Sequence, residues 1–475
     1  MNPNLLKRMK YSVAALLAFL LLISNVPAVL GASAVQTDEV RELLEEYHLS
    51  HPADEELADK EIEEMVDALQ DPYTEYFDEE EWARFNSDLE QKFVGVGIVM
   101  IDNGGKAYVD EVLADSPAAS AGVQAGDLLV SADGLSFKGK PLEEIQKAIR
   151  GEEGTSVALT VSRSGKTLKF KIDRKEIQVP IVKTALLDKG VGYLALSSFT
   201  SEAGKEFKDQ LEKLENKGLT SLILDLRNNG GGYVSAAQDI AGLFVEKGVL
   251  AHMRNREGVD EPLPIRGSTK PYPVVILVNG NTASASELLS GALRDYGVAK
   301  LVGTKTYGKG VVQSIIPVKS GGMLKVTVQE YYTPTGKKVD QVGLAPNLTV
   351  NGTAQQLIAA YRLAGGRQVT VSSGNDAITV NGVRLGQPGA MYREKNVWYV
   401  DIKLAASVIG AKLTYDAKSH SYKLSNGSEA ITIKTSDSRL KIKDGKSSID
   451  VRLLKKTFSG FTYTASGSAL KLVSG

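Results

Sequence analysis

The chain has 475 residues, which exceeds the usual size of one compact core and predicts about two to four domains. Its 56 basic residues nearly balance its 57 acidic residues, so no basic field exists to hold nucleic acid, and nucleic-acid binding is disfavoured. The chain has no cysteine, which excludes a disulfide framework, a thiolate nucleophile and a cysteine-ligated zinc site.

The segment 1–34 has the layout of a secretory signal peptide. Basic residues at positions 7, 8 and 10 precede an apolar run at 13–23, and small residues follow. A run of about 11 apolar residues is short for a membrane-spanning helix, which needs about 20. We therefore expect an extracytoplasmic protein, either secreted or attached to the outer face of the cytoplasmic membrane. An uncleaved membrane anchor is the alternative.

Residues 35–90 form the next region. Apolar residues at helical spacing, such as Val40, Leu43 and Leu44, predict two or more amphipathic helices between 37 and 88. Such helices serve either as a small packing domain or as a surface through which two copies form a homodimer, and the pattern alone leaves both uses open.

From Phe93 the pattern changes to short alternating runs separated by glycines. The stretch Asp115-Ser-Pro-Ala-Ala-Ser-Ala-Gly-Val-Gln-Ala-Gly-Asp-Leu-Leu129, followed by Asp133-Gly134 and a helical run at 142–149, resembles the PDZ family in its protease-associated form. The resemblance covers residues 91–175. It implies that a peptide with a free C-terminus adds a strand to a sheet edge, while backbone N–H groups hold its carboxylate.

The loop that would hold this carboxylate is identified by its position ahead of the motif. Glycines in it let the backbone turn its N–H groups toward an anion. The candidate residues are Phe93, Val94, Gly95, Val96, Gly97 and Ile98. An ordinary glycine-rich hairpin is the alternative interpretation.

Between 176 and 352, apolar strand-like runs alternate with helical segments. This alternation predicts an α/β layer architecture, in which active sites lie where strands end and helices begin. Residues 353–367 are expected to be a linker, and residues 368–475 carry short β-like runs rich in Lys, Ser and Gly.

The C-terminal region contains the motifs Val380-Asn-Gly-Val383, Val397-Trp-Tyr-Val-Asp401 and Leu404-Ala-Ala-Ser-Val-Ile-Gly-Ala411. With these motifs it resembles a copper amine oxidase N-terminal-like stalk domain. The resemblance implies a small exported α+β module that acts as a spacer or binds a partner in the envelope or cell wall. No copper site is expected, because His420 is the only histidine in this region.

Ser284 is the first candidate for chemistry. The segment from Val278 ends a strand and begins a helix with an apolar face, which places Ser284 at the helix N-terminus. Free N–H groups and the helix dipole there favour an oxyanion forming beside a serine. However, Ser284-x-x-Glu287 is also a capping box, and Ser286 is a rival nucleophile.

A serine nucleophile needs a base, and no histidine is well placed. The four histidines lie in the N-terminal helical region, in the C-terminal region, or beside no strand-end motif. A lysine can replace histidine if burial keeps its amine neutral. Lys309 lies between Gly308 and Gly310, which allow close approach of another element, whereas Lys305 lacks such flanks. Gln313 shares a face with Lys309 if the segment is extended.

Together these segments resemble the C-terminal processing (tail-specific) peptidase family of Ser/Lys serine proteases. The resemblance runs from about residue 40 to 351 and is carried by further ordered motifs. These motifs are Asp71-Pro-Tyr-Thr-Glu-Tyr-Phe77, Ser197-Ser-Phe-Thr200, Asp225-Leu-Arg-Asn-Asn-Gly-Gly-Gly232 and Tyr332-Thr-Pro-Thr-Gly336. The expected fold is therefore a multidomain α/β and β protein: an α/β protease core with an inserted PDZ domain, N-terminal helices and a small C-terminal module.

The resemblance also assigns roles. It makes Ser284 the nucleophile, Lys309 the general base and Gln313 the residue that positions the lysine, with backbone N–H groups of Gly231 and Ala285 in the oxyanion hole. The family often has proline before the paired glycines where this chain has Gly230, so Gly230 remains an alternative donor. No cofactor and no metal enter the implied reaction.

The implied substrates are unfolded or exported proteins cut near their C-termini, with the PDZ domain presenting the tail or gating the site. Two other functions remain: a catalytically silent PDZ scaffold that binds C-terminal peptides, and a non-protease hydrolase that uses the same pair on a small ester. Joint presence of Ser284, Lys309 and Gln313 favours the peptidase.

Overall fold

The computed structural model describes residues 34–102, 104–373, 377–385, 390–443 and 445–475, so the expected signal peptide lies outside the described residues except for Ala34. The chain divides into two compact units. The described part of the first comprises 34–83, 226–270 and 278–349, and the second comprises 84–225, 271–277 and 350–475. No helix in the described part is long and apolar enough to cross a membrane.

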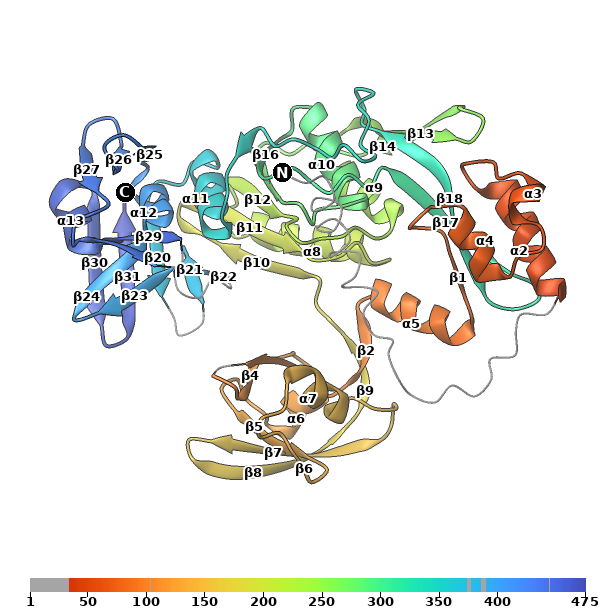
Figure 1. The fold of residues 1–475 in the computed structure, drawn as a ribbon, viewed down its shortest axis with the longest axis horizontal. Helices are drawn as coiled ribbons and strands as arrows, with labels where there is room; N and C mark the ends of the chain where they lie inside the picture. The colour runs from red at the N-terminus through yellow and green to blue at the C-terminus, as the bar shows by residue number, and fades with distance from the viewer. Residues whose placement is uncertain (1–33, 103, 374–376, 386–389, 444) are drawn as a thin grey trace. The chain divides into compact units, whose positions relative to one another are not determined.

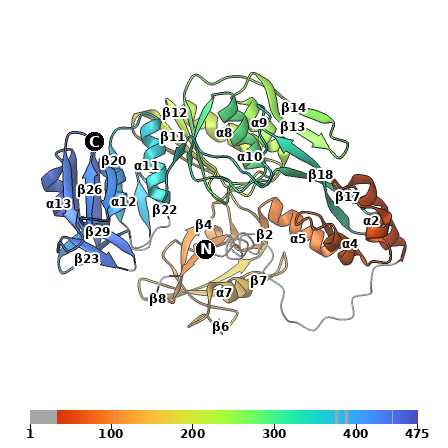
Figure 2. The same ribbon diagram turned by 45° about the horizontal axis from the view of Figure 1, so that its top comes forward.

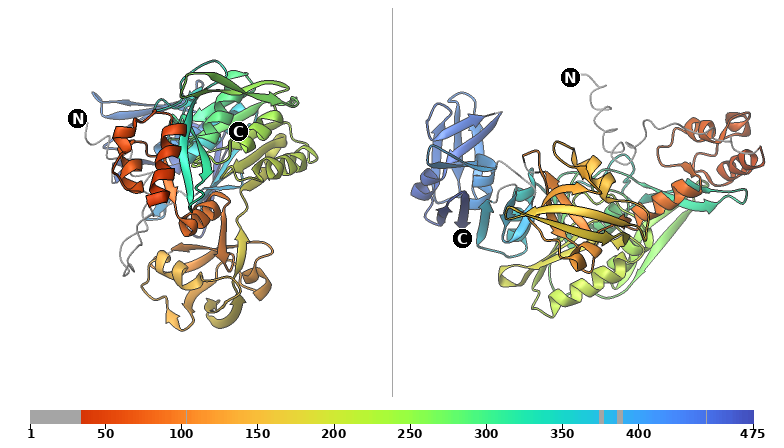
Figure 3. Two further views of the ribbon diagram at one scale, coloured as in Figure 1. Left: turned by 90° about the vertical axis from the view of Figure 1, so that its right-hand side faces the viewer. Right: turned by 90° about the horizontal axis from the view of Figure 1, so that it is seen from below.

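The first unit begins with helices that cover one face of a twisted antiparallel sheet (Figure 1; Figure 3, left). The helices are α2 (Ala34–Tyr47), α3 (Asp54–Leu57) and α4 (Ile62–Ala68), and the sheet strands are β1 (Glu75–Phe77), β13 (Lys247–Asn255), β14 (Asp260–Arg266), β17 (Val311–Pro317) and β18 (Met323–Tyr332). The strand order is β1-β18-β13-β14, with β17 also paired to β18.

Side-chain alternation along β18 decides which residues face the helices. Leu324 and Val326 are fully buried in one apolar cluster with Val40 and Leu44 of α2. Since successive side chains of a strand point to opposite faces, Lys325 and its alternate neighbours point to the other face of the sheet. The N-terminal helices therefore hold one face of this sheet and leave the other for polar side chains.

The rest of the first unit carries two packed helices and a pair of short parallel strands. These elements are α9 (Val234–Gly242), α10 (Ala285–Asp295), β16 (Ala299–Gly303) and β19 (Leu348–Thr349). Helix α5 (Glu79–Leu89) and strand β15 (Val274–Val278) cross the boundaries between the units along the chain. Nine successive residues of α10, Ala285 to Leu293, are buried, because this helix is apolar or small on almost every side.

The second unit contains a sheet in which β10 (Val182–Leu186) is antiparallel to β11 (Val191–Leu196), and β11, β12 (Ser221–Asp225) and β15 run parallel. All residues of β12 are buried, and Leu222, Ile223 and Leu224 form an apolar run before Asp225, as expected for an internal parallel strand. Short helix η1 (Asp188–Gly190) and helix α8 (Ala203–Glu215) connect these strands. The loops after β12 and β15 both leave the same edge of the sheet.

The region that resembles a PDZ domain contains a six-stranded sheet and two helices. Its elements are β2 (Lys92–Gly95), β3 (Ile98–Asp102), β4 (Ala107–Val112), α6 (Pro117–Ala121), β5 (Leu128–Ala132), β6 (Leu135–Ser136), α7 (Leu142–Ile149), β7 (Ser156–Arg163), β8 (Lys166–Asp173) and β9 (Lys175–Gln178). The sheet order is β3-β4-β5-β7-β8, with β6 on β5, while β2 pairs with β9. Strand β3 is thus an edge strand.

Residues 353–367, expected to be a linker, contain helix α11 (Thr353–Leu363), whose Leu357 and Tyr361 are buried. Beyond it the C-terminal module places helix α12 among short strands (Figure 2). Its elements are β20 (Val369–Ser373), β21 (Ile378–Val380), β22 (Val383–Leu385), β23 (Met391–Glu394), β24 (Val397–Asp401), α12 (Ile402–Ile409), β25 (Lys412–Asp416), β26 (Ser421–Ser425), β27 (Ala430–Lys434), β28 (Leu440–Lys443), β29 (Lys446–Asp450), α13 (Val451–Thr457), β30 (Phe461–Ser466) and β31 (Ala469–Ser474).

Candidate active site

Ser284 occupies the residue before α10 and has an unusual backbone conformation. Its φ is 55° and its ψ is −120°, a combination that non-glycine residues rarely adopt and that costs about 1–3 kcal/mol. Such strain persists only where surrounding contacts enforce it, and it clusters at functional sites. An ordinary helix cap has extended backbone and needs no such strain.

Glu287 makes a buried cluster of hydrogen bonds around Ser284. One carboxylate oxygen, Oε2, accepts from the backbone N–H groups of Ser284 and Lys309, both at 3.0 Å. The other, Oε1, accepts from the Gly308 N–H at 2.9 Å and from the Thr306 hydroxyl. Burial raises the pKa of Glu287 to about 7, although all these hydrogen bonds act to lower it. The capping box is therefore present, but its acid also binds the Lys309 loop.

Tyr331 provides a second connection between the same two residues. Its hydroxyl lies 2.7 Å from the Lys309 carbonyl oxygen and 3.2 Å from that of Ser284. The side chain is buried, which raises its pKa well above the usual range and keeps the hydroxyl protonated. Glu287 and Tyr331 thus hold the backbones of Ser284 and Lys309 side by side from two directions.

The amine of Lys309 lies over an aromatic ring. Its Nζ is 4.5 Å from the centroid of the Tyr73 ring. The pKa of Lys309 is lowered to about 8, mainly by burial and also by the positive charge of Lys325, while the negative charges of Asp71 and Glu287 oppose the fall. At pH 8 about half of such an amine is neutral, against well under 1% for an ordinary lysine.

Among the described residues, the side chains of Ser284, Lys309 and Gln313 are not joined to one another by hydrogen bonds. No hydrogen bond among the described residues links Ser284 Oγ to Lys309 Nζ. Gln313 Nε2 donates to the Thr327 hydroxyl at 3.1 Å, across the β17–β18 pair, and not to the lysine. Catalytic hydrogen bonds often form fully only when substrate binds, so this geometry is compatible with a catalytic pair.

Gly231 lies against the candidate nucleophile. Its φ is 103°, and a Cβ added to it would lie 2.8 Å from Ser284 Cβ and 3.0 Å from the Ala285 nitrogen, so only glycine fits here. The Gly231 N–H, however, donates to Asn229 Oδ1 at 2.9 Å. Ala285 is the first residue of α10, where N–H groups have no acceptor within the helix. In contrast, a Cβ on Gly230 meets nothing within 4 Å.

The rival residues have other surroundings. Ser286 is fully buried, and its hydroxyl donates to the Asn229 carbonyl oxygen at 3.1 Å. Lys305 is exposed and lacks the enclosed surroundings of Lys309. His48 contacts Asp71 and Ser50, and His252 contacts Asp260. No histidine in the described ranges hydrogen-bonds to Ser284.

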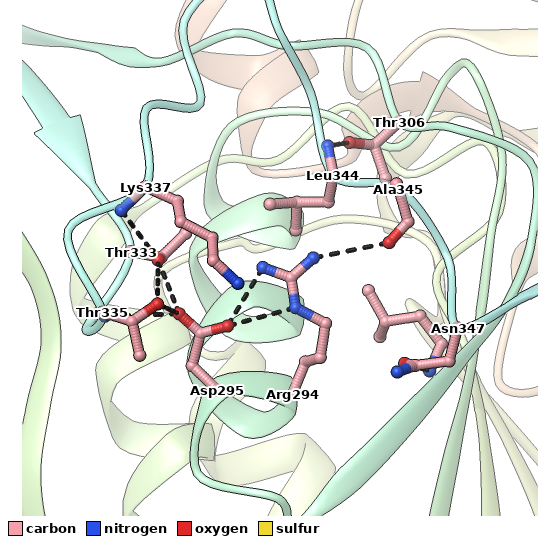
Figure 4. A network of polar contacts seen from close by, with 10 residues as sticks. Arg294, Asp295, Thr306, Thr333, Thr335, Lys337, Leu344, Ala345 and Asn347 are labelled. Atoms are coloured by element: carbon pink, nitrogen blue, oxygen red, sulfur yellow. Dashed lines mark hydrogen bonds and ion pairs between the residues drawn. The ribbon is translucent and has the colours of Figure 1, made fainter.

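The far end of α10 is held by a separate polar network (Figure 4). Asp295 accepts hydrogen bonds from the hydroxyls of Thr333 and Thr335, and Arg294 pairs with Asp295 at 3.0 Å. Burial opposes ionisation of Asp295, but these hydrogen bonds lower its pKa overall. The threonines of the Tyr332–Gly336 motif therefore fix the helix that carries Ser284.

The candidate peptide-binding loop lies at the edge of the PDZ-like sheet. Strand β2 carries Phe93, Val94 and Gly95 and pairs with β9, and Ile98 begins the edge strand β3. Gly97 has a φ of 81°, and a Cβ there would lie 2.2 Å from Ser116 Cβ, so the turn requires glycine.

The next residues of this loop are bound to the rest of the module. The carbonyl oxygen of Val96 accepts from Ala118 N, that of Gly97 accepts from Leu113 N, and the Arg150 guanidinium lies 5.2 Å from the centroid of the Phe93 ring. An unpaired strand edge that follows a glycine turn is the arrangement that strand addition uses.

Several residues at this site were missed by sequence reasoning. Asp71 and Tyr73 belong to a quoted motif but had no role, and they lie more than 200 residues from Lys309 in the chain. Tyr331 carried no local signal. Glu287 was seen only as a capping residue, and a fully buried acid in the pattern Ser-x-x-Glu is the feature that distinguishes it.

Comparison with known proteins adds to this geometry. The pattern of peptidase family S41 matches residues 190–350, and that of the PDZ domain matches residues 108–163. A probable CtpA-like serine protease of Staphylococcus aureus (strain bovine RF122 / ET3-1) is 32% identical over 369 residues, which are 77% of this chain and 73% of that protein. A protein of the same description from Staphylococcus haemolyticus (strain JCSC1435) is 33% identical over 344 residues, 72% of this chain and 68% of its own. Among solved structures, the photosystem II D1 C-terminal processing protease is 25% identical and has a TM-score of 0.45, over 70% of this chain and 98% of its own.

Proposed function

Since the chain belongs to peptidase family S41, as a C-terminal processing serine peptidase with a PDZ domain, we propose that Ser284 is its nucleophile and Lys309 its general base. The observation that carries this proposal is the shared anchoring of the two residues. Glu287 Oε2 lies 3.0 Å from both backbone nitrogens, and the Tyr331 hydroxyl lies within hydrogen-bond distance of both carbonyl oxygens. Nucleophilic catalysis by serine needs a general base close to the hydroxyl, and this shared anchoring holds the Lys309 loop beside Ser284.

The proposed reaction proceeds in two steps. Neutral Lys309 takes the proton of Ser284 Oγ as this oxygen attacks a peptide carbonyl, and the protonated lysine then gives that proton to the leaving amine. Water releases the acyl group from Ser284 in the second step, with Lys309 again as base. No cofactor takes part.

The developing oxyanion is held by backbone N–H groups. We assign them to Ala285 and Gly231, which lie together beside Ser284. Since the Gly231 N–H donates to Asn229 Oδ1 in this structure, the Asn229 side chain has to release it when substrate binds. Gly230 is the alternative donor if the loop turns the other way.

Gln313 is proposed to orient the amine of Lys309. Its Nε2 donates to Thr327, which fixes the amide and leaves Oε1 as an acceptor for an amine hydrogen. This role requires the lysine to move from the Tyr73 ring toward Ser284 when substrate binds.

We propose unfolded or exported proteins with free C-termini as substrates. The PDZ domain would add the substrate's tail to strand β3 and hold its carboxylate near Phe93 to Ile98, either presenting the tail or gating the site. Export follows from the signal-peptide pattern of the sequence, and the N-terminal helices remain the proposed dimer surface.

The test compares cleavage of an unfolded protein by the mature chain, by Ser284→Ala and by Lys309→Ala between pH 6 and 10. We expect both variants to be inactive and the wild-type rate to rise through a single pKa of about 8. Undiminished cleavage by Ser284→Ala would refute the assignment. A wild-type chain that binds C-terminal peptides without cutting them would favour the scaffold, and one that cuts only esters would favour the small-ester hydrolase.

For the C-terminal module we propose an anionic polysaccharide of the envelope as partner. Residues 368–475 contain 16 Lys and Arg against 8 Asp and Glu, whereas the remaining chain is acidic. Arg393, Arg452, Trp398 and Tyr463 line a cavity of about 220 Å³ in this module. Co-sedimentation of the full chain with an acidic but not a neutral polysaccharide, weakened by Arg393→Gln/Arg452→Gln, tests the proposal. Equal binding to both polymers refutes it.

A further inference from the structure

One face of the β17–β18 pair gathers the polar groups around the candidate base. Gln313 lies opposite Thr327, and Lys325 lies opposite Glu75 of β1, with Lys325 Nζ 2.7 Å from Glu75 Oε2. Residues 325 and 327 share one face because strand side chains alternate, and Leu324 and Val326 face the N-terminal helices instead. The polar face therefore carries a positive charge at Lys325, two residues along β18 from Thr327, the partner of Gln313.

Asp71 reaches the same group of side chains from the segment before β1. Its carboxylate accepts from the Tyr73 N–H at 3.0 Å, from the Thr74 hydroxyl at 2.6 Å and from Thr327, and it lies 3.3 Å from His48 Nε2. Burial opposes its ionisation, but these bonds lower the pKa of Asp71 to about 2, so it is a fixed negative charge. Tyr73, whose backbone N–H binds this carboxylate, places its ring under the amine of Lys309.

The two charges act on Lys309 in opposite directions. Asp71 favours the protonated amine, and Lys325 disfavours it. The other ionisable groups around the lysine and its two neighbours are Glu287, Asp340, His48, Glu75, Tyr73, Tyr307 and Tyr331. Of these, Glu287 also favours the protonated amine, and the surroundings of Tyr73 and Tyr331 raise the pKa of both phenols and so disfavour the phenolate.

We propose that Asp71 and Lys325 are positioning residues of opposite charge, in the polar cluster around Thr327 and Tyr73, that together set the pH at which Lys309 becomes a neutral base. The inference rests on the proposed function, because it matters for cleavage only if Lys309 is the base. In the described part of the structure, neither Asp71 nor Lys325 hydrogen-bonds to the amine of Lys309.

The first experiment measures the protonation of Lys309 without using catalysis. Full-length Ser284→Ala protein is labelled with trace acetic anhydride at a series of pH values, and the extent of labelling at Lys309 is read by peptide mass spectrometry. We expect Lys325→Met to raise the midpoint of the labelling curve and Asp71→Asn to lower it, each by about half a pH unit or more. The larger change is expected for Lys325→Met, because its charge has the larger effect on Lys309. Glu79→Gln and Lys319→Met, both exposed, should leave the midpoint unchanged.

The double variant separates electrostatics from damage to the fold. Combining Asp71→Asn with Lys325→Met should bring the midpoint back toward that of the parent, which a structural defect would not do. If Asp71→Asn does not fold, Lys325→Met decides alone, because the unbranched methionine side chain fills most of the space of the lysine stem, which is only 16% exposed. Midpoints that do not move, or that move in the same direction in both single variants, would overturn the proposal.

The second experiment records the pH dependence of cleavage for the same variants with Ser284 intact. The rising limb should follow the labelling midpoints, to lower pH for Asp71→Asn and to higher pH for Lys325→Met. If the labelling midpoints shift as expected but the cleavage profile does not, Asp71 and Lys325 do set the protonation of Lys309. The assignment of Lys309 as the catalytic base then fails.

Discussion

Replacing Glu287 by glutamine should separate the stability of the core from the geometry of the active site. In the folded protein the pKa of Glu287 is about 7, against an ordinary value of 4.5. Folding therefore favours the protonated form of this acid. Its contribution is complete below pH 4.5 and is lost as the pH rises through 7, which amounts to about 3 kcal/mol at pH 8.

Glutamine resembles the protonated acid and has no charge to bury. We therefore expect Glu287→Gln to be more stable than wild type at pH 8, by at most about 3 kcal/mol, and to show no advantage below pH 4.5. Activity should change in the opposite direction. The amide has one acceptor oxygen for four donors, so a backbone N–H in the Ser284 and Lys309 loops loses its partner. A displacement of about 1 Å in such a site lowers kcat about 100-fold.

The stability assay follows hydrogen exchange of the α10 amides in increasing urea at pH 4 and pH 8, and the activity assay measures kcat on an unfolded protein. Glu202→Gln, an exposed acid before α8, is the matched control and should stay within about 0.5 kcal/mol of wild type. A Glu287→Gln protein that is less stable than wild type at pH 8 would show that the hydrogen bonds from the four donors stabilise the carboxylate by more than its burial destabilises it. Unchanged kcat would show that the bonds of Glu287 do not position the pair.

Three further outcomes are expected. Lys309→Met should stabilise the core by up to about 3 kcal/mol at pH 7, because folding disfavours the ammonium form of the lysine. This gain should vanish as the pH rises from 8 to 10.5, and urea unfolding measured at a series of pH values tests it. Gly231→Ala should abolish cleavage, since its Cβ would lie 2.8 Å from Ser284 Cβ, whereas Gly230→Ala has free space and should retain most activity in the same assay. Tyr331→Phe should lower kcat about tenfold with little change in KM. A change in KM as large as the change in kcat would contradict a positioning role.

How far the sequence predicts this site depends on how local each signal is. The apolar face of α10 and the strands before it are visible in the order of residues, so the position of Ser284 at a helix start follows directly. The strain at Ser284 does not follow, because the same Ser-x-x-Glu pattern is typical of an unstrained cap. Helix α11 had a readable signal in its spaced apolar residues, such as Leu357 and Tyr361, but the segment was expected to be a linker.

The surroundings of Lys309 could not be predicted from neighbouring residues. Tyr73 and Asp71 reach it only because β1 pairs with β18, and that pairing joins segments about 250 residues apart, as Glu75 and Lys325 do. Single-sequence periodicity contains no information on such a register. The resemblance to a family supplied the base and the nucleophile, whereas the charges that tune the base come from long-range packing.

The candidate site concentrates features that each lower the stability of the fold. Ser284 adopts a strained conformation, Glu287 is a buried acid, and Lys309 is a desolvated amine. Their costs fall on one short helix and the loop beside it, so that helix has to be fixed independently of them. The network at the other end of α10 does this, because hydrogen bonds from Thr333 and Thr335 keep Asp295 ionised and anchored (Figure 4). A helix held firmly at its C-terminal end can carry a strained residue at its N-terminal end, which explains why the threonine motif accompanies the serine in this chain.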